Sequence, residues 1–142
     1  MCGALAIELS TEPVDMGAGD RVVMVQPTEP YEHCTVCGED LITASEIDEL
    51  LRQAIEIERR EAGLLSSRDI REIRLDLALT QRRLERLLGV SEKTVTRWES
   101  GTVKQSAMAD NFLRLLATHP ELVDSHGVIA REGRGPYKKR TK

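Results

Sequence analysis

Four residues in the second half of the chain have the types and the spacing for contacts with DNA. They are Lys93, Thr94, Thr96 and Arg97, in a short segment that we expect to be helical. An arginine can donate two parallel hydrogen bonds to O6 and N7 of guanine, and a lysine can donate to the same base edge or to a phosphate. Each residue alone would also fit a solvated surface. As a set on one face, they predict base contacts in a DNA major groove.

The cysteines form a second group with possible chemistry. Cys34 and Cys37 make a C-x-x-C pair that fits half a zinc site, a redox pair or two plain thiols. The thioredoxin-like setting of a redox pair is missing. Zinc takes four ligands, and we predict a zinc site with Cys2, Cys34 and Cys37 as three of them. The fourth ligand is unknown; His33 and the amine of Cys2, freed if Met1 is removed, are candidates.

The segment Thr80–Gly101 meets the local demands of a helix-turn-helix motif that would position the DNA-contacting residues. Gly89 accepts the positive φ that the turn needs, and Ser91 is expected to cap a second helix that continues to Ser100. Glu85 departs from the pattern, because small residues are usual at this crowded position. It predicts a helix adjustment or an ion pair with a neighbouring arginine. The inward-facing residues would be Leu84, Leu88, Val90, Val95 and Trp98.

Further DNA contacts are expected around this motif. Thr80 and Gln81 open the first helix, whose N-terminus can meet a phosphate. Arg82 and Lys104, with the basic tail Lys138–Arg140, suit contacts to the DNA backbone that do not depend on base sequence. The predicted DNA-binding residues are therefore Thr80, Gln81, Arg82, Ser91, Lys93, Thr94, Thr96, Arg97 and Lys104.

Charge divides the chain into two unlike halves. The net charge of −4 is the sum of −10 in the N-terminal half (residues 1–66, with 4 basic and 14 acidic side chains) and +6 in the C-terminal half (residues 67–142, with 16 basic and 10 acidic). The basic half suits DNA, and the acidic half suits a basic protein partner because complementary fields speed encounter. The alternative is two solvated faces of one domain.

The 142 residues are enough for one ordinary domain or two small ones. Two short apolar runs at 4–8 and 21–26 predict a small hairpin or two short strands, and Thr43 with Glu46 predicts a capped helix. We expect no membrane span and no secretory signal, and therefore a cytoplasmic protein. The predicted regions are a small β-containing, zinc-finger-like domain (1–42), a linking helix (43–66), a helix-turn-helix domain (67–125) and a flexible basic tail (126–142).

A longer match resembles a known family. The segments Thr80–Gln81, Thr96–Gly101, Phe112–Leu116 and His119–Leu122 are similar to the MqsA family of type II antitoxins. In that family a YgiT-type zinc finger precedes an Xre-type helix-turn-helix. Cys34–Gly38 matches the second C-x-x-C-G of the finger, whereas Cys2-Gly3 matches only the trailing half of the first.

The resemblance implies a mainly α fold, with a five-helix Xre-type domain after the small N-terminal domain and the linking helix. It also implies a homodimer that binds a palindromic operator in its own promoter and represses it, and an N-terminal half that neutralises a toxin of the ribonuclease class. One alternative is a stand-alone regulator of a mobile element or operon, without a toxin. A thiol enzyme using Cys34 and Cys37 is disfavoured because no histidine or carboxylate constellation supports catalysis; we expect no enzymatic activity.

Overall fold

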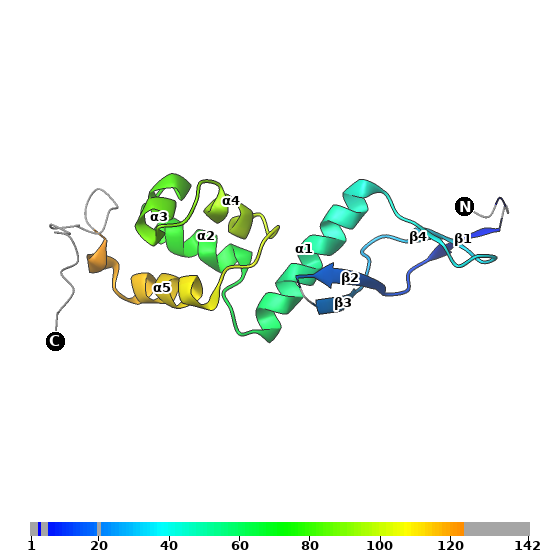
Figure 1. Cartoon of the computed structure of the whole chain (residues 1–142), viewed down its shortest axis with the longest axis horizontal. Helices are drawn as coiled ribbons and strands as arrows, with labels where there is room; N and C mark the ends of the chain where they lie inside the picture. The colour runs from blue at the N-terminus through cyan, green and yellow to red at the C-terminus, as the bar shows by residue number, and fades with distance from the viewer. Residues whose placement is uncertain (1–2, 4–5, 20, 124–142) are drawn as a thin grey trace, which may run out of the picture.

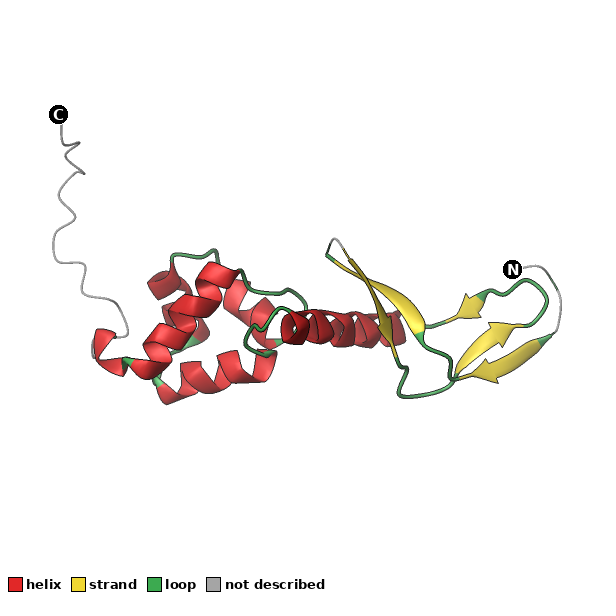
Figure 2. Ribbon diagram, turned by 90° about the horizontal axis from the view of Figure 1, so that it is seen from below, coloured by secondary structure: helices red, strands yellow, loops and turns green. Residues whose placement is uncertain are grey.

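The computed structural model describes residues 3, 6–19 and 21–123. Its strands lie at one end, its short helices at the other, and one long helix, α1, joins the two parts (Figure 1). Seen from below, α1 extends from the helices toward the strands as a straight rod (Figure 2). The predicted tail at 126–142 lies outside the described residues.

The N-terminal strands form two small antiparallel sheets. One sheet has the order β1-β4-β5 and the other is the hairpin β2-β3. The strands are β1 (Ile7–Ser10), β2 (Val14–Ala18), β3 (Arg21–Val25), β4 (Tyr31–Cys34) and β5 (Asp40–Leu41). The two apolar runs form two short strands, β1 and β3, but not the alternative hairpin, since β3 pairs with β2 and β1 pairs with β4.

The pairing differs from the expected hairpin because the segment between the two runs contains a strand, β2. Its many turn-forming residues gave no indication of a strand. Met16 and Ala18 alternate along β2, as the side chains of a strand do. Both are buried in a core with Leu50 and Ala54 of α1. Burial of this alternating face against α1 outweighs the turn preference of the neighbouring residues.

Helix α1 (Ala44–Glu61) begins at the predicted residue. The Thr43 hydroxyl accepts a hydrogen bond from the Glu46 N–H, and the Glu46 carboxylate accepts one from the Thr43 N–H. This capping box satisfies two N–H groups of the first turn and confirms the expectation from sequence. The helix ends before Gly63, which has a φ of 67°.

The remaining helices are α2 (Ser67–Asp76), α3 (Gln81–Leu88), α4 (Thr94–Glu99) and α5 (Ala107–Thr118), followed by a 3₁₀ turn, η1 (Pro120–Leu122). Ser66, Thr80 and Ser106 accept capping hydrogen bonds at the starts of α2, α3 and α5. Fully buried residues from all four helices share one core: Ile70, Leu84, Val95, Leu113 and Leu116.

The expected mainly α fold with a five-helix domain after a linking helix is wrong. The described residues contain five α-helices in total, one of which is α1, and are 48% helical and 17% strand, a mixed α/β composition. The last expected helix is only the η1 turn, because three residues opening with a proline close a single tight turn. None of the helices in the described part combines the length and hydropathy needed to span a membrane.

Candidate nucleic-acid interface

The connection between α3 and α4 contains two residues in the left-handed conformation. Gly89 ends α3 with a φ of 70°, as predicted, and Lys93 has a φ of 65°. Because of this second turn, α4 begins only at Thr94 and is six residues long. The prediction that Ser91 caps a helix running to Ser100 is therefore wrong. The Ser91 and Thr94 hydroxyls instead share a hydrogen bond at 2.9 Å.

Glu85 of α3 takes the place of a local cap on α4. Its side chain is buried, and Oε1 accepts a hydrogen bond from the Val95 N–H at 3.1 Å. This N–H belongs to the first turn of α4, where no side chain within the helix caps the backbone. A carboxylate there also interacts favourably with the positive end of the helix dipole. The residue that departed from the sequence motif therefore joins α3 to α4, rather than pairing with an arginine.

A polar network orients Gln81 between α2, α3 and α4. Arg74 forks onto Glu99, with Nε to Oε1 at 2.5 Å and Nη2 to Oε2 at 3.0 Å. The hydrogen bonds that Arg74 donates to the Glu99 carboxylate raise the pKa of Arg74 above its ordinary value. Gln81 Nε2 donates to Glu99 at 2.8 Å, and its Oε1 accepts from the Thr96 hydroxyl at 3.0 Å. The start of α3 and the outer face of α4 are thereby held side by side.

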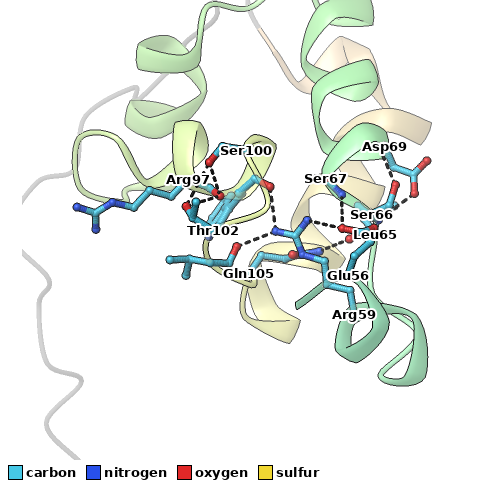
Figure 3. A network of polar contacts seen from close by, with 12 residues as sticks. Glu56, Arg59, Leu65, Ser66, Ser67, Asp69, Arg97, Ser100, Thr102 and Gln105 are labelled. Carbon is cyan, nitrogen blue, oxygen red and sulfur yellow. Dashed lines mark hydrogen bonds and ion pairs between the residues drawn. The ribbon is translucent and has the colours of Figure 1, made fainter. Parts of the chain in front are cut away.

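Three predicted contact residues lie exposed on α4 or at its start. Lys93 and Arg97 are exposed four positions apart, one helical turn, and Thr96 is exposed between them. Gln81, Arg82, Lys93 and Thr96 line the same shallow depression. Within the described residues the Arg97 guanidinium has no hydrogen-bond or ion-pair partner, and it extends away from the surrounding polar network (Figure 3). Lys93 and Arg97 are therefore available together for a ligand.

The other predicted contact residues are less available. Thr94 is half-buried, and the Thr80 hydroxyl accepts a hydrogen bond from the Arg83 N–H. Arg82 forms an exposed ion pair with Glu92 at 3.8 Å. The Lys104 ammonium pairs with the buried carboxylate of Glu58 in α1. Lys104 is thus engaged in an ion pair within the chain.

Sequence patterns missed three residues that support this surface: Arg59, Arg74 and Glu99. Each side chain is largely buried and forms hydrogen bonds to other elements. Charged residues are expected at the surface unless they are paired, and nothing in the local sequence indicates a partner 25 or more positions away.

The structure describes two of the three predicted metal ligands. Cys34 is buried at the end of β4 and Cys37 is exposed in the following turn, where the Gly38 N–H donates to the Cys34 carbonyl at 2.8 Å. His33 pairs with Asp40 at 2.7 Å. No cluster of three or more metal-binding side chains occurs among the residues described, and Cys2 lies outside them. Two thiols do not complete a zinc site, so its occupancy stays a prediction that metal analysis of purified protein tests.

Comparison with known proteins assigns the chain to a class. The model of one family, described as the antitoxin component of the bacterial toxin-antitoxin system, MqsA, matches residues 1–126. A search of curated proteins found no significant match. The chain belongs to the MqsA antitoxin family, as the sequence resemblance indicated.

Proposed function

We propose that this antitoxin is a sequence-specific DNA-binding repressor of its own operon, acting in the cytoplasm without enzymatic activity. The observation that carries the proposal is the joint exposure of Thr96 and Arg97 on α4 and of Lys93 just before it. Cations and a hydroxyl on one short helix suit base edges in a major groove. The +6 charge of the C-terminal half supports the proposal, because neutralised phosphates dominate the affinity for DNA.

Each side chain has a chemical role in this proposal. Arg97 forks onto guanine O6 and N7, and Lys93 donates to the same groove or to a neighbouring phosphate. Gln81, oriented by Glu99 and Thr96, contacts the DNA backbone where the start of α3 meets it. A homodimer would present two such helices to the half-sites of a palindrome, about 34–36 Å apart or a multiple of that distance.

Replacement of Arg97 by alanine tests the base-reading role. We expect Arg97→Ala to weaken binding to the operator by about 1–3 kcal/mol and to relax its sequence preference. Arg86→Ala, at an exposed position of α3, is the matched control that loses the same charge elsewhere. Fluorescence anisotropy with operator and scrambled duplexes at several salt concentrations measures both effects. An equal loss on every duplex would exclude base reading by Arg97.

We propose further that the N-terminal half binds and neutralises a basic toxin of the ribonuclease class. The family supports a toxin partner, and the charge of −10 in residues 1–66 suits a basic one. Val22 and Met24 are exposed on the outer side of β3, next to Asp15 of β2. An apolar pair with an acidic neighbour suits the centre and rim of a protein interface.

Co-expression with the protein encoded by the neighbouring gene tests whether the N-terminal half binds a toxin. We expect co-purification, and loss of it in Met24→Asp, with Met108→Asp on α5 as the control at another exposed methionine. Operator binding by Met24→Asp should equal that of the unchanged chain. If no neighbouring protein co-purifies while the operator is still bound, the chain is a stand-alone regulator.

A further inference from the structure

The end of α1 is joined to the end of α4 by one buried arginine. Arg59 is 0% exposed, and its Nη2 donates to the carbonyl oxygens of Trp98 at 2.9 Å and Val103 at 2.7 Å. Its Nη1 donates to Glu56 of the same helix at 3.2 Å. Figure 3 shows the Arg59 guanidinium pointing into this network between α1 and the end of α4. Two segments about 40 positions apart are thereby connected.

This contact matters because α4 is too short to be stable alone. Helices of six residues are marginal in water and depend on packing and on groups that satisfy their ends. The Glu85 carboxylate satisfies an N–H at the start of α4, and the Arg59 guanidinium satisfies a carbonyl at its end. Each charge has the sign that the helix dipole favours at that end. Glu85 comes from α3, whereas Arg59 comes from the N-terminal half.

Arg59 also acts close to Arg97, the proposed base-reading residue. The Arg97 carbonyl accepts hydrogen bonds from the Thr102 N–H at 3.0 Å and from the Ser100 hydroxyl at 3.2 Å. These bonds close the turn from Trp98 to Val103, and Arg59 holds both of its ends. A shift of this turn would therefore displace the backbone of Arg97.

Other contacts extend this connection to the strands. Glu58, beside Arg59, is buried and pairs with Lys104 in the segment between α4 and α5. A Cβ added to Gly19, at the tip of the β2–β3 hairpin, would lie 3.9 Å from the Glu58 carboxylate. Arg21 of β3 pairs with Glu61 at 3.2 Å. The β2–β3 hairpin therefore lies next to the end of α1, and the end of α1 in turn contacts the turn after α4.

We propose that Arg59 is a positioning residue for α4, through which the N-terminal half sets the affinity and specificity for operator DNA. The part of the proposal that concerns DNA rests on the proposed function. The part that concerns α4 does not, because Arg59 contacts α4 in the free protein.

Arg59→Met and Arg59→Lys in the full chain test the proposal, with Arg60→Met as the control at the adjacent exposed arginine. Hydrogen exchange followed by mass spectrometry reports the free protein. We expect faster exchange of the amides of residues 97–103 in Arg59→Met, intermediate exchange in Arg59→Lys, which keeps a charged donor, and no change in Arg60→Met. Trp98, the only tryptophan in the chain, should show a shifted emission maximum in the same order.

Operator binding is the second readout. We expect Arg59→Met to weaken operator binding by about tenfold while binding to scrambled DNA changes much less, with partial rescue by Arg59→Lys. Such a loss of discrimination separates positioning from a general loss of folded protein, which would weaken both duplexes equally. If Arg59→Met is poorly folded, Arg59→Lys alone decides the outcome through its exchange pattern and its discrimination between duplexes.

Two results would overturn the proposal: unchanged exchange of residues 97–103 in folded Arg59 variants, or unchanged discrimination between operator and scrambled DNA. Failure of the proposed function looks different. In that case Arg97→Ala leaves operator binding intact, while the exchange measurements on Arg59 variants still report whether α4 is held.

Discussion

The strand region and the four-helix region each bury an apolar core, but they expose different chemistry. The strands leave large apolar side chains in solvent, with Leu9 74% and Val22 69% exposed. The helices leave Met108 in solvent as well, but they also expose Arg97 on α4 and Lys93 just before it. Exposed apolar groups favour a protein partner, and exposed cations beside hydroxyls favour a nucleic acid. The difference supports the proposal that the two ends of the molecule bind different ligands.

The two regions also stabilise their helices differently. The start of α1 is capped by Thr43 and Glu46, which are three residues apart. The two ends of α4 are satisfied by Glu85 and Arg59, which come from other helices. Helix α1 therefore depends on its own sequence at its start, whereas α4 depends on the assembled fold.

Because the two regions have separate cores, a cavity in one core should destabilise mainly that region. This is the largest effect on stability that we expect. Leu84→Ala removes a fully buried side chain from the core that contains Trp98 and should lower the free energy of unfolding of the helices by about 2–5 kcal/mol. Leu50→Ala, the matched change in the strand-region core, should affect the same transition less. Urea unfolding followed by Trp98 fluorescence measures both. Equal shifts would show that the two regions unfold as one unit.

The dependence of α4 on α3 predicts a smaller effect. Glu85→Ala leaves the Val95 N–H without its acceptor and should lower the free energy of unfolding by about 1–3 kcal/mol. Glu85→Gln keeps an acceptor oxygen and should recover most of the loss. The same urea titration applies. If Glu85→Ala is as stable as the unchanged chain, packing alone holds the start of α4.

The buried contacts of Asp110, which link α5 to the segment after α1, predict that the protein loses stability in acid. Near neutral pH we expect no change from this group. Burial on its own raises the pKa of Asp110, but hydrogen bonds from Arg114, the Leu65 N–H and Gln105 outweigh it and hold the pKa below its ordinary value of 3.8. The folded chain therefore binds fewer protons than the unfolded chain. The stabilisation of the fold by Asp110 is therefore fully present at pH values above its ordinary pKa. It is lost as the pH falls through the lower pKa of the folded chain.

Urea titrations at a series of pH values check this expectation. Asp110→Asn should reduce the acid loss of stability without removing it, because Asp69 also has a lowered pKa, mainly through its hydrogen bonds with Ser66. Asp76→Asn, at the exposed end of α2, is the control. An unchanged acid profile in Asp110→Asn would show that this contact does not contribute.

Much of the fold was predictable where the determining residues lie close together in sequence. The starts of α1, α2, α3 and α5 follow from caps whose partners are three residues apart, and Gly89 marks the end of α3. The prediction failed for the hairpin alternative, although not for two short strands, since the partner of β3 depends on which alternating face packs on α1. It failed also at Ser91, because Lys93 adopts a left-handed conformation that residue type does not indicate.

Sequence alone determined the family, the position of the turn at Gly89 and the exposure of Arg97, because motif and helical periodicity are local properties. Tertiary structure decided how α4 is held. Its supporting partners lie 10 residues away at Glu85 and 39 residues away at Arg59. Whether such charged groups reach a backbone N–H or carbonyl depends on how whole helices pack, and no pattern within one segment contains that information.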